Sequence, residues 1–351
     1  MKPTENLTAL ILRFIHRRFI WMIVSSYIVA AMMPGFGLWI RNFSFDRAGF
    51  IPLLMLAALL FNAGLGVKTE ELIRLLQKPF VLLGGVSCNV MIPLTFIVAV
   101  SFLRHIWHNQ EEVQQILVGL ALVAAMPIAG ASTAWSQNAN GNLALSLGLV
   151  LSTTTLSPLL TPFVLHMAGF VTTGDYSEDL HELASGEAAS FLGIWVVLPT
   201  FLGIFAHMLA GEILVARAIP YLKIINYCIL LLLNYSNASL TLPNVVSQPD
   251  MDFLAVMLAV VIGLCISAFS SGYLLARLSQ VSNSEKVSLM FGLGMNNNGT
   301  GLVLASVALA DHPQVMLPII FYNLAQHLVA SAVDLALFTS RSPKPPLPPS
   351  V

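Results

Sequence analysis

Two polar clusters interrupt a largely apolar chain, and they contain the residues best suited to bind a solute. The first cluster, Gly130–Asn142, includes Ser132 and Thr133, and the second, Gly292–Gly301, includes three successive asparagines at positions 296–298. Hydroxyl and carbonyl oxygens are hard ligands for small cations. Asparagine amides both donate and accept hydrogen bonds, and can therefore recognise a polar solute. The two clusters favour noncovalent binding of an ion, a polar molecule or both.

Both clusters are expected to interrupt helices. Pro127 precedes the first cluster and removes one helical donor, while Gly130 tolerates an unwound backbone. Carbonyls freed by such a break can bind a cation, and the free helix N-terminus favours an anionic group. The second cluster could instead be a polar surface loop. However, its apolar flanks 287–291 and 302–309 are too short to be two separate spans.

Other polar residues lie inside apolar stretches, and structural alternatives remain open for them. The hydroxyl groups of segment 152–157 could bond to carbonyls of their own helix. His327 could bind a solute or form a hydrogen bond between helices. The sequence contains no nucleophile elbow, HExxH motif or phosphate-binding loop, so we expect a protein that is not an enzyme and has no cofactor, except a possible coupling sodium ion.

The composition indicates a membrane protein. Apolar residues make up 57% of the 351 residues, charged residues only 9%, and the mean hydropathy is +0.82. Soluble domains have about 25% charged residues, so this chain has too few to face water on all sides. The net charge of -1 and the lack of a basic stripe predict no nucleic-acid partner. The expected surroundings are a lipid bilayer.

Hydrophobic segments predict an all-α membrane protein with ten transmembrane helices. A span needs roughly 20 mainly apolar residues. The expected spans are 19–39, 50–67, 79–103, 115–135, 141–170, 187–211, 217–241, 253–278, 287–310 and 314–339. The fourth span of each half carries a polar cluster, and the fifth contains two prolines. Because each half has an odd number of spans, the sequence predicts two inverted five-helix repeats, residues 19–171 and 187–339.

The distribution of basic residues predicts the orientation. With both termini placed in the cytoplasm, thirteen of the sixteen Lys and Arg residues fall on the inner side. This arrangement makes 1–18 a cytoplasmic segment, 172–186 an acidic external loop and 340–351 a disordered cytoplasmic tail. Short loops and the lack of a disulfide framework favour a bacterial inner membrane.

Four segments give the chain a resemblance to the bile acid:sodium symporter family. They are 61–66 (FNAGLG), 141–146 (GNLALS), 156–162 (LSPLLTP) and 294–297 (GMNN). The resemblance covers nearly the whole chain. It implies a core domain and a panel domain, with broken helices 4 and 9 crossing in the core. It also implies two sodium sites behind the crossing and an organic anion, such as a bile acid or small carboxylate, between the domains.

The resemblance implies specific site residues. Ser132, Thr133, Ser146 and Asn296 are the expected ion ligands, and Gly130, Asn297, Asn298 and His327 the expected substrate contacts. The sequence departs from the family pattern at an expected ion ligand. Gly292 stands where the family has a glutamate that both sodium sites share. We therefore expect a secondary transporter of a small organic anion. The sequence leaves open whether transport is coupled to sodium. A sodium-independent carrier and a non-transporting sensor with the same fold are the alternatives.

Overall fold

The computed structural model describes residues 7–43, 50–67 and 79–339, and regular structure within them is helical. The predicted tail 340–351 and residues 1–6 of the predicted N-terminal segment lie outside the described residues. The helices are α1 (Leu7–Met32), α2 (Gly35–Asn42), α3 (Phe50–Leu65), α5 (Pro79–Ser101), α6 (Gln110–Ala125), α7 (Ala131–Asn138), α8 (Leu143–Gly169), α9 (Asp175–Glu182), α10 (Ala188–Leu192), α11 (Leu198–Ala210), α12 (Glu212–Ala238), α13 (Leu242–Ser247), α14 (Met251–Leu278), α15 (Asn283–Gly294), α16 (Asn298–Ala308) and α17 (Met316–Thr339).

The protein is an integral, multi-pass membrane protein. In the part of the chain that the structure describes, six helices are long and apolar enough to cross a membrane, and a seventh is formed if α1 and α2 count as one span. Helices suit a bilayer because they satisfy their backbone hydrogen bonds internally. The other predicted spans correspond to shorter helices, since α3 and α6 have 16 residues each, α15 has 12 and α16 has 11.

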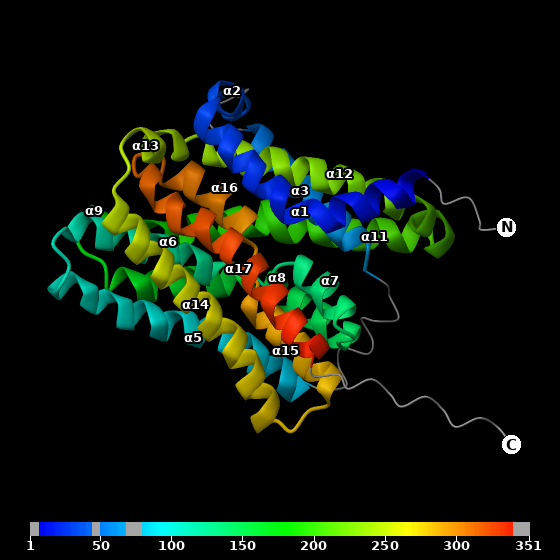
Figure 1. Ribbon diagram of the computed structural model, residues 1–351. Helices are drawn as coiled ribbons and strands as arrows, with labels where there is room; N and C mark the ends of the chain where they lie inside the picture. Colours follow the sequence, from blue (N-terminus) through cyan, green and yellow to red (C-terminus); the bar gives the residue numbers. More distant parts are fainter. Residues whose placement is uncertain (1–6, 44–49, 68–78, 340–351) are drawn as a thin grey trace, which may run out of the picture.

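The first predicted span, 19–39, is not one straight helix. It is divided between α1 and α2, whose axes differ by 90°. Pro34 lies at the bend and precedes the first residue of α2. Because proline has no backbone N–H and restricts the residue before it, the helix ends at Met32. The bend places α2 across the end of α12 (Figure 1).

The prediction of a loop over 172–186 was wrong, because α9 occupies 175–182 and continues through a π-helical turn over 183–187 into α10. Gly174 has a φ of +61° and starts this helix. Asp175 and Glu178 in the first turn complement the helix dipole. Tyr176 and Leu180 are buried, so the acidic segment still has an apolar face that packs against the protein.

The long helices form two groups (Figure 1). Helices α1, α3, α11 and α12 pack against one another. Helices α5, α6, α8, α14, α15 and α17 form the other group, with its apolar core centred on α6. Helix α16 touches both groups, because it packs on α17 and α6 on one side and on α3 and α12 on the other.

Candidate functional site

The two predicted helix breaks meet at the centre of the candidate site. Helix α6 ends at Ala125 and α7 begins at Ala131, while α15 ends at Gly294 and α16 begins at Asn298. An antiparallel bridge joins Ile128 to Asn296 between these breaks. The N–H of Ala129 donates to the Met295 carbonyl (2.8 Å), and the N–H of Asn297 donates to the Pro127 carbonyl (2.9 Å). We call this arrangement the crossing.

Side chains from α8 brace the crossing. The Thr153 hydroxyl accepts a hydrogen bond from the Ile128 N–H (3.1 Å) and donates one to the Leu149 carbonyl (2.8 Å). The Thr161 hydroxyl donates to the Ala125 carbonyl at the end of α6. Thr153 thus forms the back-bond expected in its own helix and also holds the unwound segment. The sequence indicated the back-bond but not the bond to Ile128, because the latter joins residues from separate helical segments.

Asn296 also forms hydrogen bonds to two neighbouring helices. Its Nδ2 donates to the Val123 carbonyl (2.8 Å), and its backbone N–H donates to Oε1 of Gln326 (3.1 Å). Its Oδ1 is buried and has no hydrogen-bond partner among the described residues. The asparagine therefore fastens α15 to α6 and α17, while one oxygen ligand remains free.

Replacing Thr153 with valine is expected to lower the free energy of unfolding by about 1–3 kcal/mol, because the buried Ile128 N–H would lose its acceptor. The measurement is the melting temperature of the purified protein in detergent. Thr95→Val is the matched control, since Thr95 is exposed and bonds only to the Met91 carbonyl of its own helix. Equal melting temperatures for the two variants would contradict a bracing role for Thr153.

Two of the predicted ion ligands are fully buried without partners. The Oγ atoms of Ser132 and Ser146, both on residues with 0% exposure, have no hydrogen-bond partner within the described chain. Thr133 differs, because its hydroxyl donates to the Gly130 carbonyl (2.7 Å) and its side chain is half-buried. Gly130 itself is exposed. Ser132, Ser146 and Asn296 thus each have a buried side-chain oxygen without a hydrogen-bond partner among the described residues.

The predicted substrate contacts differ in their environments. Asn297 caps α16, with its Oδ1 accepting from the Thr300 N–H (3.3 Å). Asn298 is 1% exposed, and neither of its amide atoms has a partner in the described part of the protein. His327 on α17 is buried edge-on against the Phe19 ring, and its Nδ1 has no partner among the described residues.

The surroundings of Gly292 are apolar. A Cβ atom at Gly292 would lie 3.0 Å from Cδ1 of Leu149, and one at Gly85 would lie 2.4 Å from Cδ2 of the same leucine. The fully buried Leu149 side chain thus fills the space that these two glycines leave between α5 and α15. The cluster around Leu149 consists of Ile128, Leu145, Leu149, Ala276, Leu289 and Leu293. A cation at this place would lack a carboxylate partner and would be costly to bury.

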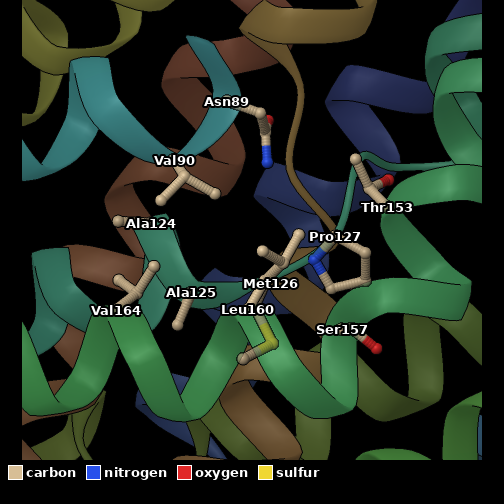
Figure 2. A pocket seen from close by; sticks show the side chains of 10 residues that line it. All are labelled: Asn89, Val90, Ala124, Ala125, Met126, Pro127, Thr153, Ser157, Leu160 and Val164. Atoms are coloured by element: carbon tan, nitrogen blue, oxygen red, sulfur yellow. The ribbon is translucent and has the colours of Figure 1, made fainter. Parts of the chain in front are cut away.

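A small pocket lies beside the unwound segment between α6 and α7, and Figure 2 shows its lining. Asn89 of α5 extends toward the segment that contains Pro127, and Thr153 and Ser157 of α8 also line the pocket. The pocket holds about one water-sized molecule. This pocket is too small for an organic anion.

Residues 53–248 match the Sodium Bile acid symporter family. The chain belongs to this family. The matched segment begins in α3 and ends just after α13, so it includes the α6–α7 break but not the second break between α15 and α16. The predicted family resemblance is confirmed by this match.

Three relatives from bacteria and plants are similar to this chain over most of its length. "Uncharacterized sodium-dependent transporter YocS" of Bacillus subtilis is 22% identical over 315 residues, 89% of both chains. "Uncharacterized protein YbaS" of the same organism is 26% identical over 61% of this chain and 66% of its own length. "Probable sodium/metabolite cotransporter BASS2, chloroplastic" of Oryza sativa is 24% identical over 82% of this chain and 62% of its own. The family and two of these names, those of YocS and BASS2, describe transporters rather than enzymes.

Proposed function

We propose that this protein is a secondary transporter that carries a small organic anion across a bilayer by alternating access. The crossing is the observation that carries the proposal. Two broken segments from distant parts of the chain pair there, and buried polar atoms without partners surround them. Broken helices that face each other near mid-membrane are typical substrate and ion sites of secondary transporters.

The repeat arrangement remains part of the proposal. The breaks lie at 126–130 and 295–297, in the fourth predicted span of each half. If α3, the α6–α7 pair and the α15–α16 pair are each counted as spans, the chain has the ten spans of two inverted repeats. In this scheme the group of α1, α3, α11 and α12 is the panel domain and the other group is the core. Both termini would lie in the cytoplasm of a bacterial cell, with the protein in its inner membrane.

The chemistry around the start of α16 supports an anion as the solute. Asn297 already accepts from the Thr300 N–H, and the Asn298 N–H donates to the Asn296 carbonyl (2.9 Å), so the helix dipole is what favours negative charge at this end of α16. Asn298 adds at this position a buried amide that has no partner among the described residues. We assign Asn297, Asn298, Gly130 and His327 as substrate contacts. The names of the relatives, which include a metabolite cotransporter, agree with a small metabolite.

The unpartnered oxygens of Ser132, Ser146 and Asn296 favour one sodium site made of neutral ligands, with Thr133 nearby. The Leu149 cluster opposes a second, carboxylate-centred site at Gly292. We therefore propose that the protein binds one sodium ion or none. The sodium-independent carrier is the second candidate, and the apolar surroundings of Gly292 favour it.

Uptake into liposomes tests the proposal. The purified protein would be reconstituted and supplied with labelled acetate, pyruvate or succinate, in sodium buffer and in choline buffer. Saturable uptake of one carboxylate is the expected result. Thermal stabilisation by a carboxylate without uptake would instead favour a non-transporting sensor, because a ligand of the folded state raises the melting temperature without crossing the membrane.

Ser146→Ala separates the two ion hypotheses. If one sodium ion is bound at the crossing, this change removes a ligand oxygen and should abolish any difference between uptake in sodium and in choline. If no ion is used, uptake in the two buffers should be equal in wild type and variant alike. Ser267→Ala is the matched control, since the Ser267 hydroxyl bonds within its own helix, to the Gly263 carbonyl (2.8 Å). A sodium dependence that survives Ser146→Ala would contradict the assignment of this serine.

A further inference from the structure

Arg41 joins three helices at the end of the molecule where α2 lies (Figure 1). Its Nη1 donates to Oδ1 of Asn237 on α12 (2.9 Å), and its Nη2 donates to the carbonyl of Ser306 on α16 (2.8 Å). The Arg41 side chain is half-buried. Both acceptors are neutral groups, and neither compensates the positive charge.

The charge of Arg41 has no anionic partner in the described part of the chain. The ion pairs found there each involve a histidine, at positions 108, 207 and 312. A partly buried cation is costly unless it is paired. A guanidinium carries five N–H donors, and the bonds to Asn237 and Ser306 use two of them. Within the described residues, the other three N–H donors have no acceptor.

Unpartnered amides lie next to Arg41. Nδ2 of Asn237 has no hydrogen-bond partner among the described residues, although its Oδ1 is held by Arg41. One turn earlier on the same face of α12, both amide atoms of Asn234 are also without partners. Asn237 is 0% exposed and Asn234 is 1% exposed. Since a buried amide without partners costs about 1–3 kcal/mol, these groups point to a ligand.

The last turn of α12 lies near Arg41 and near the start of α16, which adjoins the crossing. Cδ2 of Leu233 lies 3.9 Å from a Cβ built on Gly299, near the start of α16. Arg41 connects Asn237 with Ser306, farther along α16. The last turn of α12, which rises by about 6 Å from Leu233 to Asn237, therefore lies beside α16, and the Arg41 side chain links its end to Ser306. We call Arg41, Asn237, Asn234 and Asn298 the polar strip.

We propose that Arg41 and Asn237 form a carboxylate-binding site at the end of the polar strip, where the transported organic acid binds on its way to or from the crossing. The proposal rests on the proposed function. Arginine is suited to this task, because its planar donors match the two oxygens of a carboxylate. The Nδ2 of Asn237 supplies a further donor, and Asn234 lies one turn earlier on the same face of α12.

Asn237→Asp is the sharpest test. The aspartate has nearly the same shape and would place a carboxylate against the Arg41 guanidinium, within the protein itself. The expected result is an unchanged or higher melting temperature together with a carboxylate affinity at least tenfold weaker, because the internal anion competes with the solute. Asn244→Asp is the matched control, since Asn244 is exposed on neighbouring α13 and gives the same change in net charge.

The affinity would be measured in two ways, as thermal stabilisation by acetate, pyruvate and succinate in detergent and as the KM of uptake into liposomes. Wild-type affinity in Asn237→Asp, or a clearly lower melting temperature, would overturn the proposal. If wild-type protein binds a carboxylate that Asn237→Asp does not bind, yet transports none, the Arg41 site stands and the proposed transport function fails. If transport of the anion is equal in both proteins, only the Arg41 site fails.

Arg41→Gln provides a second measurement that a purely structural role would not affect. Glutamine can retain a hydrogen bond to Asn237 but carries no charge. The variant is expected to lose the preference for acetate over the neutral analogue acetamide, while Arg104→Gln, a change to another half-buried arginine, retains it. An unchanged preference for acetate in Arg41→Gln would overturn the proposal.

Discussion

Replacing Asn298 with leucine is expected to weaken solute binding by about 10- to 100-fold without destabilising the protein. Asn298 is buried at the start of α16, and neither amide atom has a partner in the described part of the chain. If the amide binds an anionic solute, its loss removes a hydrogen bond to a charged group, worth about 1.5–3 kcal/mol. Without the solute, an apolar residue of similar shape leaves no polar group unsatisfied.

The stability and uptake measurements would be made on the same preparations. Asn323→Leu is the contrasting control, because Nδ2 of Asn323 donates to the Tyr27 hydroxyl (2.9 Å) and this buried hydroxyl would lose its partner. We expect that control to melt at a lower temperature than the wild type, and Asn298→Leu to melt at the same temperature or higher. Normal uptake by Asn298→Leu would show that Asn298 does not contact the solute.

Replacing Gly64 or Gly203 with leucine is expected to disrupt the packing of α3 on α11. A Cβ at Gly64 would lie 2.0 Å from the Thr200 carbonyl oxygen, and one at Gly203 would lie 2.0 Å from the Phe61 carbonyl oxygen. Because backbone atoms oppose both positions, the helices must move apart to admit any side chain. Small residues commonly permit such close helix contacts in membranes. Overpacking costs about 1–3 kcal/mol for each site, and often more where the backbone must shift.

The melting temperature in detergent and the yield of folded protein would measure this effect. Gly193→Leu is the matched control, because nothing lies within 4 Å of a Cβ at Gly193 in the same helical segment. We expect the control to fold normally, and the double variant at positions 64 and 203 to be the least stable of the set. Equal stability of all variants would contradict the close contact of α3 with α11.

The sequence predicted both helix breaks from local chemistry. Pro127 and the glycines near it disfavour a continuous helix, and three asparagines in an apolar segment are hard to explain by packing. The sequence did not reveal which atoms meet there. The bridge between Ile128 and Asn296 joins residues far apart in the chain, and Thr153 braces it from a third segment.

Two local predictions failed because packing overrode them. The acidic segment 172–186 contains α9, since its buried Tyr176 and Leu180 favour a helix against the protein. The first predicted span bends by 90° at Pro34, although its composition is apolar on both sides of the bend. Short polar stretches and single prolines are ambiguous in sequence, and only the neighbouring helices decide their shape.

The sequence by itself determined the membrane class, the positions of the two breaks and the family. These depend on composition, on proline and glycine, and on short runs of residues that contact one another locally. Only the tertiary structure decided that Leu149 fills the space beside Gly292, and that Arg41 lies against Asn237 and Ser306. The reason is physical. Whether a buried polar group is satisfied, or a glycine leaves space, depends on atoms that other helices bring to it.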